Sequence, residues 1–213
     1  MIDLFSGTGG ASAPFRDAGW EVIRVELDPA FEAEFHADAR TWSWYGRQPN
    51  LVWASPPCTE FARESMPWSR TKPAWVRCPC CENYWCNQHE KHAHECDCPP
   101  IEQWETDPYS VRPPSMELVD AADLIIRECN PDCWVIENVK GATRYLTPRY
   151  GKPLVLGPVF LWGRFPRFYR RVKFWKEKLS SKQKAARAAI PYQIGEGLRI
   201  SIEEMLWLNS LGD

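Results

Sequence analysis

The sequence has no long apolar run. No stretch approaches the ~20 consecutive apolar residues of a membrane-spanning helix. The first ten residues, MIDLFSGTGG, lack the basic start of a secretory signal peptide, and the chain contains no internal repeat or low-complexity tract. These absences argue against membrane, secreted and repeat proteins. We therefore expect a soluble, cytoplasmic protein with no membrane partner.

The charge is small overall but unevenly distributed. The formal net charge is −2, yet residues 1–139 carry 11 Lys/Arg against 23 Asp/Glu, whereas residues 140–213 carry 15 against 5. A positive field over the C-terminal third can attract phosphates even though the whole chain is slightly acidic. For residues 176–187 alone, a solvated lysine-rich surface helix is the preferred interpretation.

Short apolar runs alternate with helical patterns. With 213 residues and 44% hydrophobic composition, the chain can bury one sizeable core, so we expect a single domain over residues 1–213. Strand composition marks residues 2–5, 21–26, 50–54 and 133–136. Helical patterns mark residues 11–18, 29–37, 115–128 (capped by Ser115, stopped by Asn130-Pro131), 180–189 and 195–208. The alternation predicts an α/β fold with a mostly parallel, doubly wound, Rossmann-like sheet, and residues 151–175 favour hairpins.

Several predicted strands end in residues suited to chemistry. The first strand runs into DLFSGTGG, a glycine turn before a helix that is typical of a nucleotide-like cofactor site. Glu26 ends the second strand, where a carboxylate can accept from both hydroxyls of a ribose, and Asp38 is placed to accept from an adenine amino group. Cys58 follows two prolines, and Glu137 follows WVI. An inert buried cysteine and surface carboxylates are the alternative interpretations.

The segments DLFSGTGG, SPPC and ENV resemble three motifs of the cytosine-C5 DNA methyltransferases, in the family's order. The resemblance covers residues 1–58 and 112–145 and, more faintly, residues 189–198, AIPYQIGEGL, which resemble the last cofactor-side motif. It implies a monomeric protein with an S-adenosylmethionine-dependent methyltransferase fold, of the compact kind found in phage and prophage genomes. The implied reaction is methyl transfer to C5 of cytosine in duplex DNA, after the base is flipped out.

The resemblance also implies roles for individual residues. Cys58 would add to C6 of the cytosine, Glu137 would hold N3, and Asn138 would support the loop that carries Cys58. A degenerate match to the family's arginine motif leaves Arg164 and Arg167 as candidates for the far side of the base. The implied cofactor contacts, with Phe5 and Leu27 flanking the adenine and the backbone of the glycine turn at the methionine end, are Asp3, Phe5, Ser6, Gly7, Gly9, Glu26, Leu27, Asp38 and Pro56.

An insertion, residues 59–112, separates the two halves of the resemblance. It far exceeds the ~12–15 residues of an ordinary structureless loop, so it needs its own source of stability. Six of the nine cysteines and three of the four histidines lie within residues 75–100, in pairs suited to tetrahedral zinc in a reducing compartment. We predict one or two Zn²⁺, with surface thiols as the alternative and with candidate ligands Cys78, Cys81, Cys86, His89, His92, Cys96 and Cys98.

Recognition of DNA needs a separate explanation, because the family usually carries a target-recognition domain before its last motif. Here residues 150–188 form only a reduced basic region, so the zinc module is a candidate DNA reader. The candidates for phosphate contact are Arg149, Lys152, Arg167, Arg170, Arg171 and Lys173. Two alternatives stay open: the same chemistry on RNA or a free cytosine nucleotide, and a catalytically inactive zinc-containing DNA-binding protein.

Overall fold

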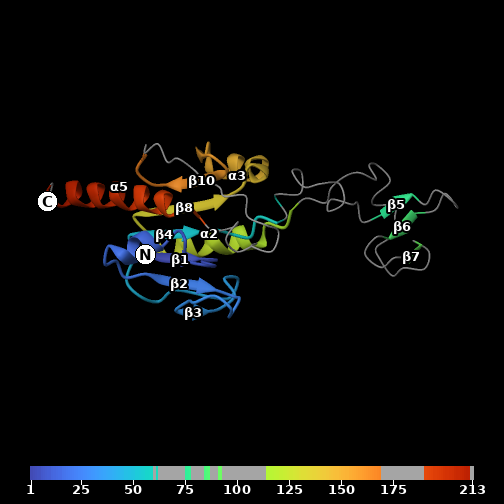
Figure 1. Cartoon of the computed structure of the whole chain (residues 1–213), viewed down its shortest axis with the longest axis horizontal. Coiled ribbons are helices and arrows are strands. Elements are labelled where there is room, and N and C mark those ends of the chain that lie inside the picture. The colour runs from blue at the N-terminus through green and yellow to red at the C-terminus, as the bar shows by residue number, and fades with distance from the viewer. Residues whose placement is uncertain are drawn as a thin grey trace. The chain divides into compact units, whose positions relative to one another are not determined.

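The main unit of the chain is built on a seven-stranded sheet. The computed structural model describes residues 1–59, 61, 75–77, 84–86, 91–92, 114–168 and 190–211. The chain divides into one unit of Met1–Cys58 with Met116–Asp213 and a second unit of Thr59–Ser115. In the first unit the strand order is β3-β2-β1-β4-β8-β10-β9 (Figure 1). The strands are β1 (Ile2–Leu4), β2 (Ile23–Glu26), β3 (Phe35–His36), β4 (Leu51–Ala54), β8 (Cys133–Asn138), β9 (Leu154–Leu156) and β10 (Val159–Arg164).

Five neighbouring strands of this sheet are parallel. β1 pairs with β2 and β4, β2 pairs with β3, and β4 pairs with β8, whereas β10 is antiparallel to both β8 and β9. The predicted α/β sheet is thereby confirmed as mostly parallel, and a hairpin is present in the region where we expected one. The carboxyl ends of β1, β2, β4 and β8 lie at one edge, called the carboxyl edge below; the opposite one is the amino edge.

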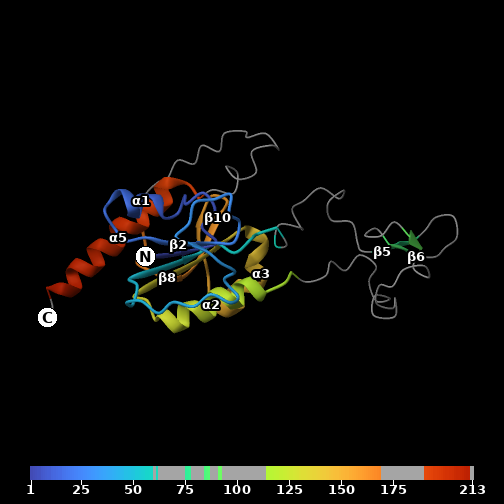
Figure 2. The ribbon, with the colours of Figure 1, turned by 90° about the horizontal axis from the view of Figure 1, so that it is seen from below.

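Helices cover both faces of the sheet, as Figure 2 shows. Helices α1 (Ala13–Asp17) and α5 (Tyr192–Ser210) contact each other and share a buried cluster with Trp53, Val135 and Leu161. Helices α2 (Glu117–Cys129) and α3 (Thr143–Tyr150) lie on the other face. On α5, Ile194, Leu198 and Ile202 recur every four residues and are fully buried. Among the described residues, no helix has the length and apolar character needed to cross a membrane.

The helix expected over residues 29–37 is wrong. Asp28 instead begins a turn, where its carboxylate accepts from the backbone N–H of Ala30 at 2.9 Å. The Glu34 carboxylate then accepts from the backbone N–H of Arg24 at 2.7 Å, and Phe35 pairs with Val25 as the start of β3. A tertiary contact with β2 therefore overrides the local helical composition.

Helix α2 differs from its prediction only at its ends. It begins at Glu117 with Met116, rather than Ser115, in the N-cap position. It ends as expected before Asn130, which takes a left-handed conformation with φ 43°, and Pro131 follows.

The second unit is described over three short strands. β5 (Trp75–Arg77), β6 (Tyr84–Cys86) and β7 (Lys91–His92) form an antiparallel sheet in that order. The pairing puts the backbones of two candidate zinc ligands, Cys86 and His92, on neighbouring strands. The part of the chain that the structure describes contains no group of three or more possible metal ligands. Zinc stays a prediction, because the other candidates lie outside the described residues: Cys78, Cys81, His89, Cys96 and Cys98.

Candidate active site

The turn after β1 is held against β2. The backbone N–H of Phe5 donates to the carbonyl of Val25 at 2.9 Å, and Phe5 itself has a positive φ of 58°. Gly9 has φ +75°, and a Cβ there would lie 2.9 Å from Nη1 of Arg24. Beside Gly7, by contrast, a Cβ would meet open space. A ligand can therefore approach the backbone closely at Gly7, which is what a cofactor cradle requires.

Glu26 joins this turn to the end of β2. One carboxylate oxygen accepts from the backbone N–H of Gly7 at 2.8 Å. The other accepts from the N–H groups of Leu27 and Asp28, at 2.9 and 3.1 Å. These bonds fix the carboxylate at the rim of the turn and leave about one of its four lone-pair sites free, which can accept from a hydroxyl of a ribose.

Asp3 is a buried carboxylate below the same turn. Its side chain is 1% exposed, and neither oxygen has a hydrogen-bond partner among the described residues. Ser12 is close, but its hydroxyl donates to the carbonyl of Gly9 at 3.4 Å. Burial raises the pKa of Asp3 to about 7, against the opposing effects of Ser12 and Arg24. Such an unsatisfied group beneath a glycine turn fits a ligand that carries positive charge or N–H donors.

The other candidates for cofactor binding lie around this turn, and their surroundings fit that role to different degrees. Ser6 has a buried hydroxyl oxygen without a described partner, and Leu27 is 63% exposed beside Glu26. Asp38 differs from its expected role, because Arg40 binds both of its oxygens, at 2.6 to 3.1 Å. These bonds lower the pKa of Asp38 to about 2. Asp38 would have to leave Arg40 to accept from an adenine.

Three contacts fix the loop that leads to Cys58. The backbone N–H of Ser55 donates to the carbonyl of Leu4 at 3.1 Å, and Nε1 of the fully buried Trp53 donates to the Ser55 hydroxyl at 2.8 Å. The Asn138 amide donates to the carbonyl of Pro56 at 3.0 Å. Cys58, which is half-buried, therefore follows a loop tied to both neighbouring strands. The sequence alone did not identify Trp53 and Ser55 as residues that hold this loop.

Glu137 and Cys58 come from adjacent strands at one edge. Ala54, the last residue of β4, pairs with Ile136, so Glu137 is the next residue along β8. Glu137 is half-buried, and Asn138 is completely buried, with its side-chain oxygen accepting from the backbone N–H of Val139 at 2.9 Å. A thiol and a carboxyl group thus project from neighbouring strand ends, the place where open α/β sheets bind their ligands.

The segment before α5 closes the glycine turn from the opposite side. A Cβ at Gly10 would lie 2.6 Å from the carbonyl oxygen of Ile190, and one at Gly195 would lie 2.5 Å from that of Ala11. Both glycines are needed because two backbones meet there. The structure therefore brings together the first motif of the sequence and the faint last one.

Two of the predicted arginines do not belong to this edge. Arg164 pairs with Trp134 near the start of β8, and its guanidinium donates to the carbonyl of Pro131, so the antiparallel course of β10 carries it to the amino edge. Arg149 is held by Asp120 and Asp123, at 2.5 and 2.9 Å, and is not available to phosphates. Lys152 and Arg167 are exposed, and the remaining phosphate candidates lie outside the described residues: Arg170, Arg171 and Lys173.

A groove of about 760 Å³ lies at the amino edge. Trp20, Trp44, Arg47 and Leu206 are among its lining residues. It contains none of the predicted site residues, and parallel α/β sheets bind ligands at the carboxyl ends of their strands. We therefore assign the candidate site to the carboxyl edge and not to this groove.

Comparisons with known proteins find distant likenesses among solved structures. No family model matches the sequence, and no curated protein matches it. One similar solved structure is described as a DNA modification methyltransferase encoded within a prophage of E. coli, with a TM-score of 0.39 and 16% identity over 76% of this chain and 45% of that chain. Another is a mutant of Spodoptera frugiperda DNMT2, with a TM-score of 0.35 and 15% identity over 84% and 52%. The chain spans about half the length of these two structures.

Proposed function

We propose that this chain transfers a methyl group from S-adenosylmethionine to C5 of cytosine in DNA, with Cys58 as the nucleophile. The observation that carries the proposal is the hydrogen bond from Asn138 to the carbonyl of Pro56. It ties the SPPC segment to the ENV segment at adjacent strand ends, beside a glycine turn built to accept a ligand. The three segments that resemble the family motifs therefore lie close together in space.

The reaction follows from the chemistry of the side chains. The Cys58 thiolate adds to C6 of a flipped-out cytosine, and the electron pair of the C5–C6 double bond moves to C5. Glu137 stabilises this electron-rich ring by donating a proton or hydrogen bond at N3. When bound, S-adenosylmethionine would supply an electrophilic methyl group, and C5 would bond to it as the S–CH3 bond of the sulfonium breaks and S-adenosylhomocysteine leaves. Loss of the C5 proton to a base then restores the double bond and expels the Cys58 thiolate.

The cofactor side of the proposal rests on the glycine turn. The open space beside Gly7, the Glu26 carboxylate and the unsatisfied Asp3 fit an adenosyl group with a cationic amino acid end. Phe5, Ser6, Leu27 and Pro56 stay candidates for cofactor contact. The zinc module stays a proposal for ordering the insertion and reading DNA.

One observation favours a catalytically inactive DNA-binding protein. Arg164, the candidate for the family's arginine motif, lies at the amino edge. Between β9 and β10, the turn at the carboxyl edge is only Gly157 and Pro158, without a cation. Such a protein would bind DNA without transferring methyl groups, so activity and binding must be measured separately.

The test is transfer of radiolabelled methyl from S-adenosylmethionine to mixed-sequence DNA, with RNA and dCMP as parallel acceptors. Cys58→Ala should abolish labelling. Cys129→Ala is the matched control, because burial raises the pKa of that thiol to about 11 and leaves it protonated. DNA containing 5-fluorocytosine should trap a covalent adduct through Cys58, since the C5 fluorine cannot leave as a proton does. Label in RNA or dCMP alone would reject DNA as the substrate, and no label in any acceptor would reject the enzyme.

A further inference from the structure

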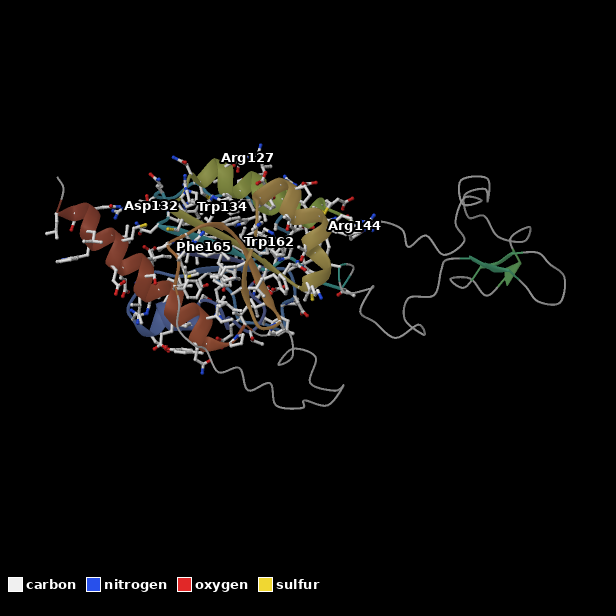
Figure 3. The ribbon with its side chains drawn as sticks, turned by 90° about the horizontal axis from the view of Figure 1, so that it is seen from above. Arg127, Asp132, Trp134, Arg144, Trp162 and Phe165 are labelled. Atoms are coloured by element: carbon white, nitrogen blue, oxygen red, sulfur yellow. The ribbon has the colours of Figure 1, made fainter. Side chains whose placement is uncertain are left out.

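The helix that follows Glu137 and Asn138 carries two exposed cations at the carboxyl edge. A 3-10 turn, η5 (Lys140–Ala142), runs directly into α3, and the Thr143 backbone N–H donates to the Lys140 carbonyl. Lys140 and Arg144 are therefore about one helical turn apart. Both side chains are exposed, and neither forms an ion pair with a described residue. Figure 3 shows Arg144 at the opposite end of the sheet from Asp132, which precedes β8.

Most other described arginines are neutralised by carboxylates. Arg16 and Arg24 pair with Glu34, Arg40 pairs with Asp38, and Arg199 pairs with Glu203. On α3 itself, Arg149 is bound by Asp120 and Asp123. The exposed cations next to Glu137 thus differ from the pattern of these arginines, and among the described residues they have no acidic partner that would compete with a phosphate.

Helix α3 also holds these cations on a rigid support. Its last turn is fixed to α2 through Arg149 and through the Tyr150 hydroxyl, which donates to Asp123 at 3.3 Å. Its middle is anchored by the fully buried Leu146. Its first turn is exposed beside the site at Arg144. A cation on a fixed helix loses less conformational entropy on binding than one on a loose loop.

Charge is divided along the carboxyl edge. On the β2 side, Glu26 and Asp28 are acidic and Glu26 already belongs to the glycine turn. On the β8 side, Lys140 and Arg144 are basic, and the Cys58 loop lies between the two sides because β4 lies between β1 and β8. A polyanion is repelled by the first side and attracted by the second.

We propose that Lys140 and Arg144 bind phosphates of the DNA strand that carries the target cytosine, beside the flipped base. The inference rests on the proposed function and names the residues through which that site contacts its polymer substrate. Arginine binds phosphate through two parallel N–H donors, and lysine binds it as a point charge. These contacts orient the strand without reading its sequence.

The test is equilibrium binding of the full chain to a fluorescent DNA duplex over a series of salt concentrations. Lys140→Gln and Arg144→Gln should each weaken binding by about three- to tenfold and lower the salt-dependence slope by about 0.9, and the double variant should lose about twice that slope. Arg47→Gln is the matched control, since Arg47 is an exposed cation at the amino edge without a described ion pair. Its slope should equal that of the wild type.

The outcomes separate this inference from the proposed function. An unchanged slope in both variants, with an active wild type, would overturn the phosphate contacts alone. A reduced slope in a protein that transfers no methyl group would support the contacts and reject the enzyme. A slope change with RNA but not with DNA would overturn DNA as the partner. Unchanged melting temperatures and cofactor affinity establish that the variants fold.

Discussion

The two edges of the central sheet use similar polar residues in different ways. At the amino edge, the Asn50 amide donates to Asp132 at 2.8 Å, the Gln48 amide donates to the carbonyl of Asn130, and Arg164 donates to that of Pro131. These hydrogen bonds connect the residues before β4 and the last residue of β10 to the residues that precede β8. At the carboxyl edge, Asp3 lacks a described partner and Lys140 and Arg144 are exposed without one. The hydrogen-bonded groups named at the amino edge thus hold the fold together, while those named at the carboxyl edge stay available for ligands.

Exchanging Glu137 for Gln tests the chemistry of the carboxyl edge most strongly. A glutamine has nearly the same shape but cannot pass a proton to N3, so we expect kcat for methyl transfer to fall by about 10²- to 10³-fold. Cofactor affinity should stay within about twofold. The control is Asp132→Asn at the other end of β8, which should leave kcat unchanged. Equal losses in the two variants would remove the distinction between the edges.

Asp3→Asn should stabilise the protein at neutral and higher pH. The folded-state pKa of Asp3 is raised to about 7 by burial, so the folded carboxyl group holds its proton between pH 4 and 7 while the unfolded chain has lost it. Stability therefore falls as pH rises through this window and levels off above pH 7. The variant should gain roughly 2 to 4 kcal/mol at pH 8 and nothing at pH 3.

Urea unfolding of both proteins across this pH range measures the difference. A constant gain at every pH would show that Asp3 does not titrate in this range. If a cationic ligand normally compensates Asp3, the variant should also bind S-adenosylhomocysteine more weakly above pH 7. That second measurement separates a cofactor contact from a purely structural carboxylate.

Asn138→Ala should affect both stability and rate. It removes the donor to the Pro56 carbonyl and leaves a buried acceptor unpaired, which costs about 1 to 3 kcal/mol. Because the loop before Cys58 then loses one of its three contacts, kcat should fall by about 10- to 100-fold. Asn50→Ala, the matched change at the amino edge, should cost about 1 kcal/mol or less and leave kcat intact. Chemical denaturation and the methyl-transfer assay distinguish the two.

The smallest expected effect contrasts two arginines of α3. Arg149→Met breaks the ion pairs with Asp120 and Asp123, which are partly exposed, so we expect a loss of about 1 kcal/mol. Arg144→Met should leave stability unchanged. For DNA affinity we expect the opposite result: Arg144→Met should weaken DNA binding, and Arg149→Met should leave it unchanged. A larger loss of DNA affinity in the Arg149 variant would contradict the roles given to both residues.

Much of the sheet could be predicted from the sequence, because its apolar runs are short and largely buried on both faces. The β4 strand and the start of β8 are examples. The helix expected at residues 29–37 failed because the Glu34 carboxylate binds β2, a contact that no local pattern contains. The local helix propensity of this segment was outweighed by a tertiary hydrogen bond.

The candidate site was predictable in part for a similar reason. The sequence placed Cys58 and Glu137 at the ends of two strands, and the parallel pairing of β4 with β8 makes these ends neighbours. The anchors of that loop, Trp53 and Ser55, carry no motif and could be found only in three dimensions. Arg164 was misassigned because a sequence match does not reveal that β10 runs antiparallel to β8.

The contacts between the glycine turn and α5 bear on how the protein matures during synthesis. Trp20 donates to Glu203 at 2.8 Å across 183 positions of the chain, and Gly10 meets Ile190 backbone to backbone. Contacts so distant in sequence form late, because the intervening chain must be made and ordered first. The glycine turn therefore completes its half of the site only after the whole of α5 has been synthesised.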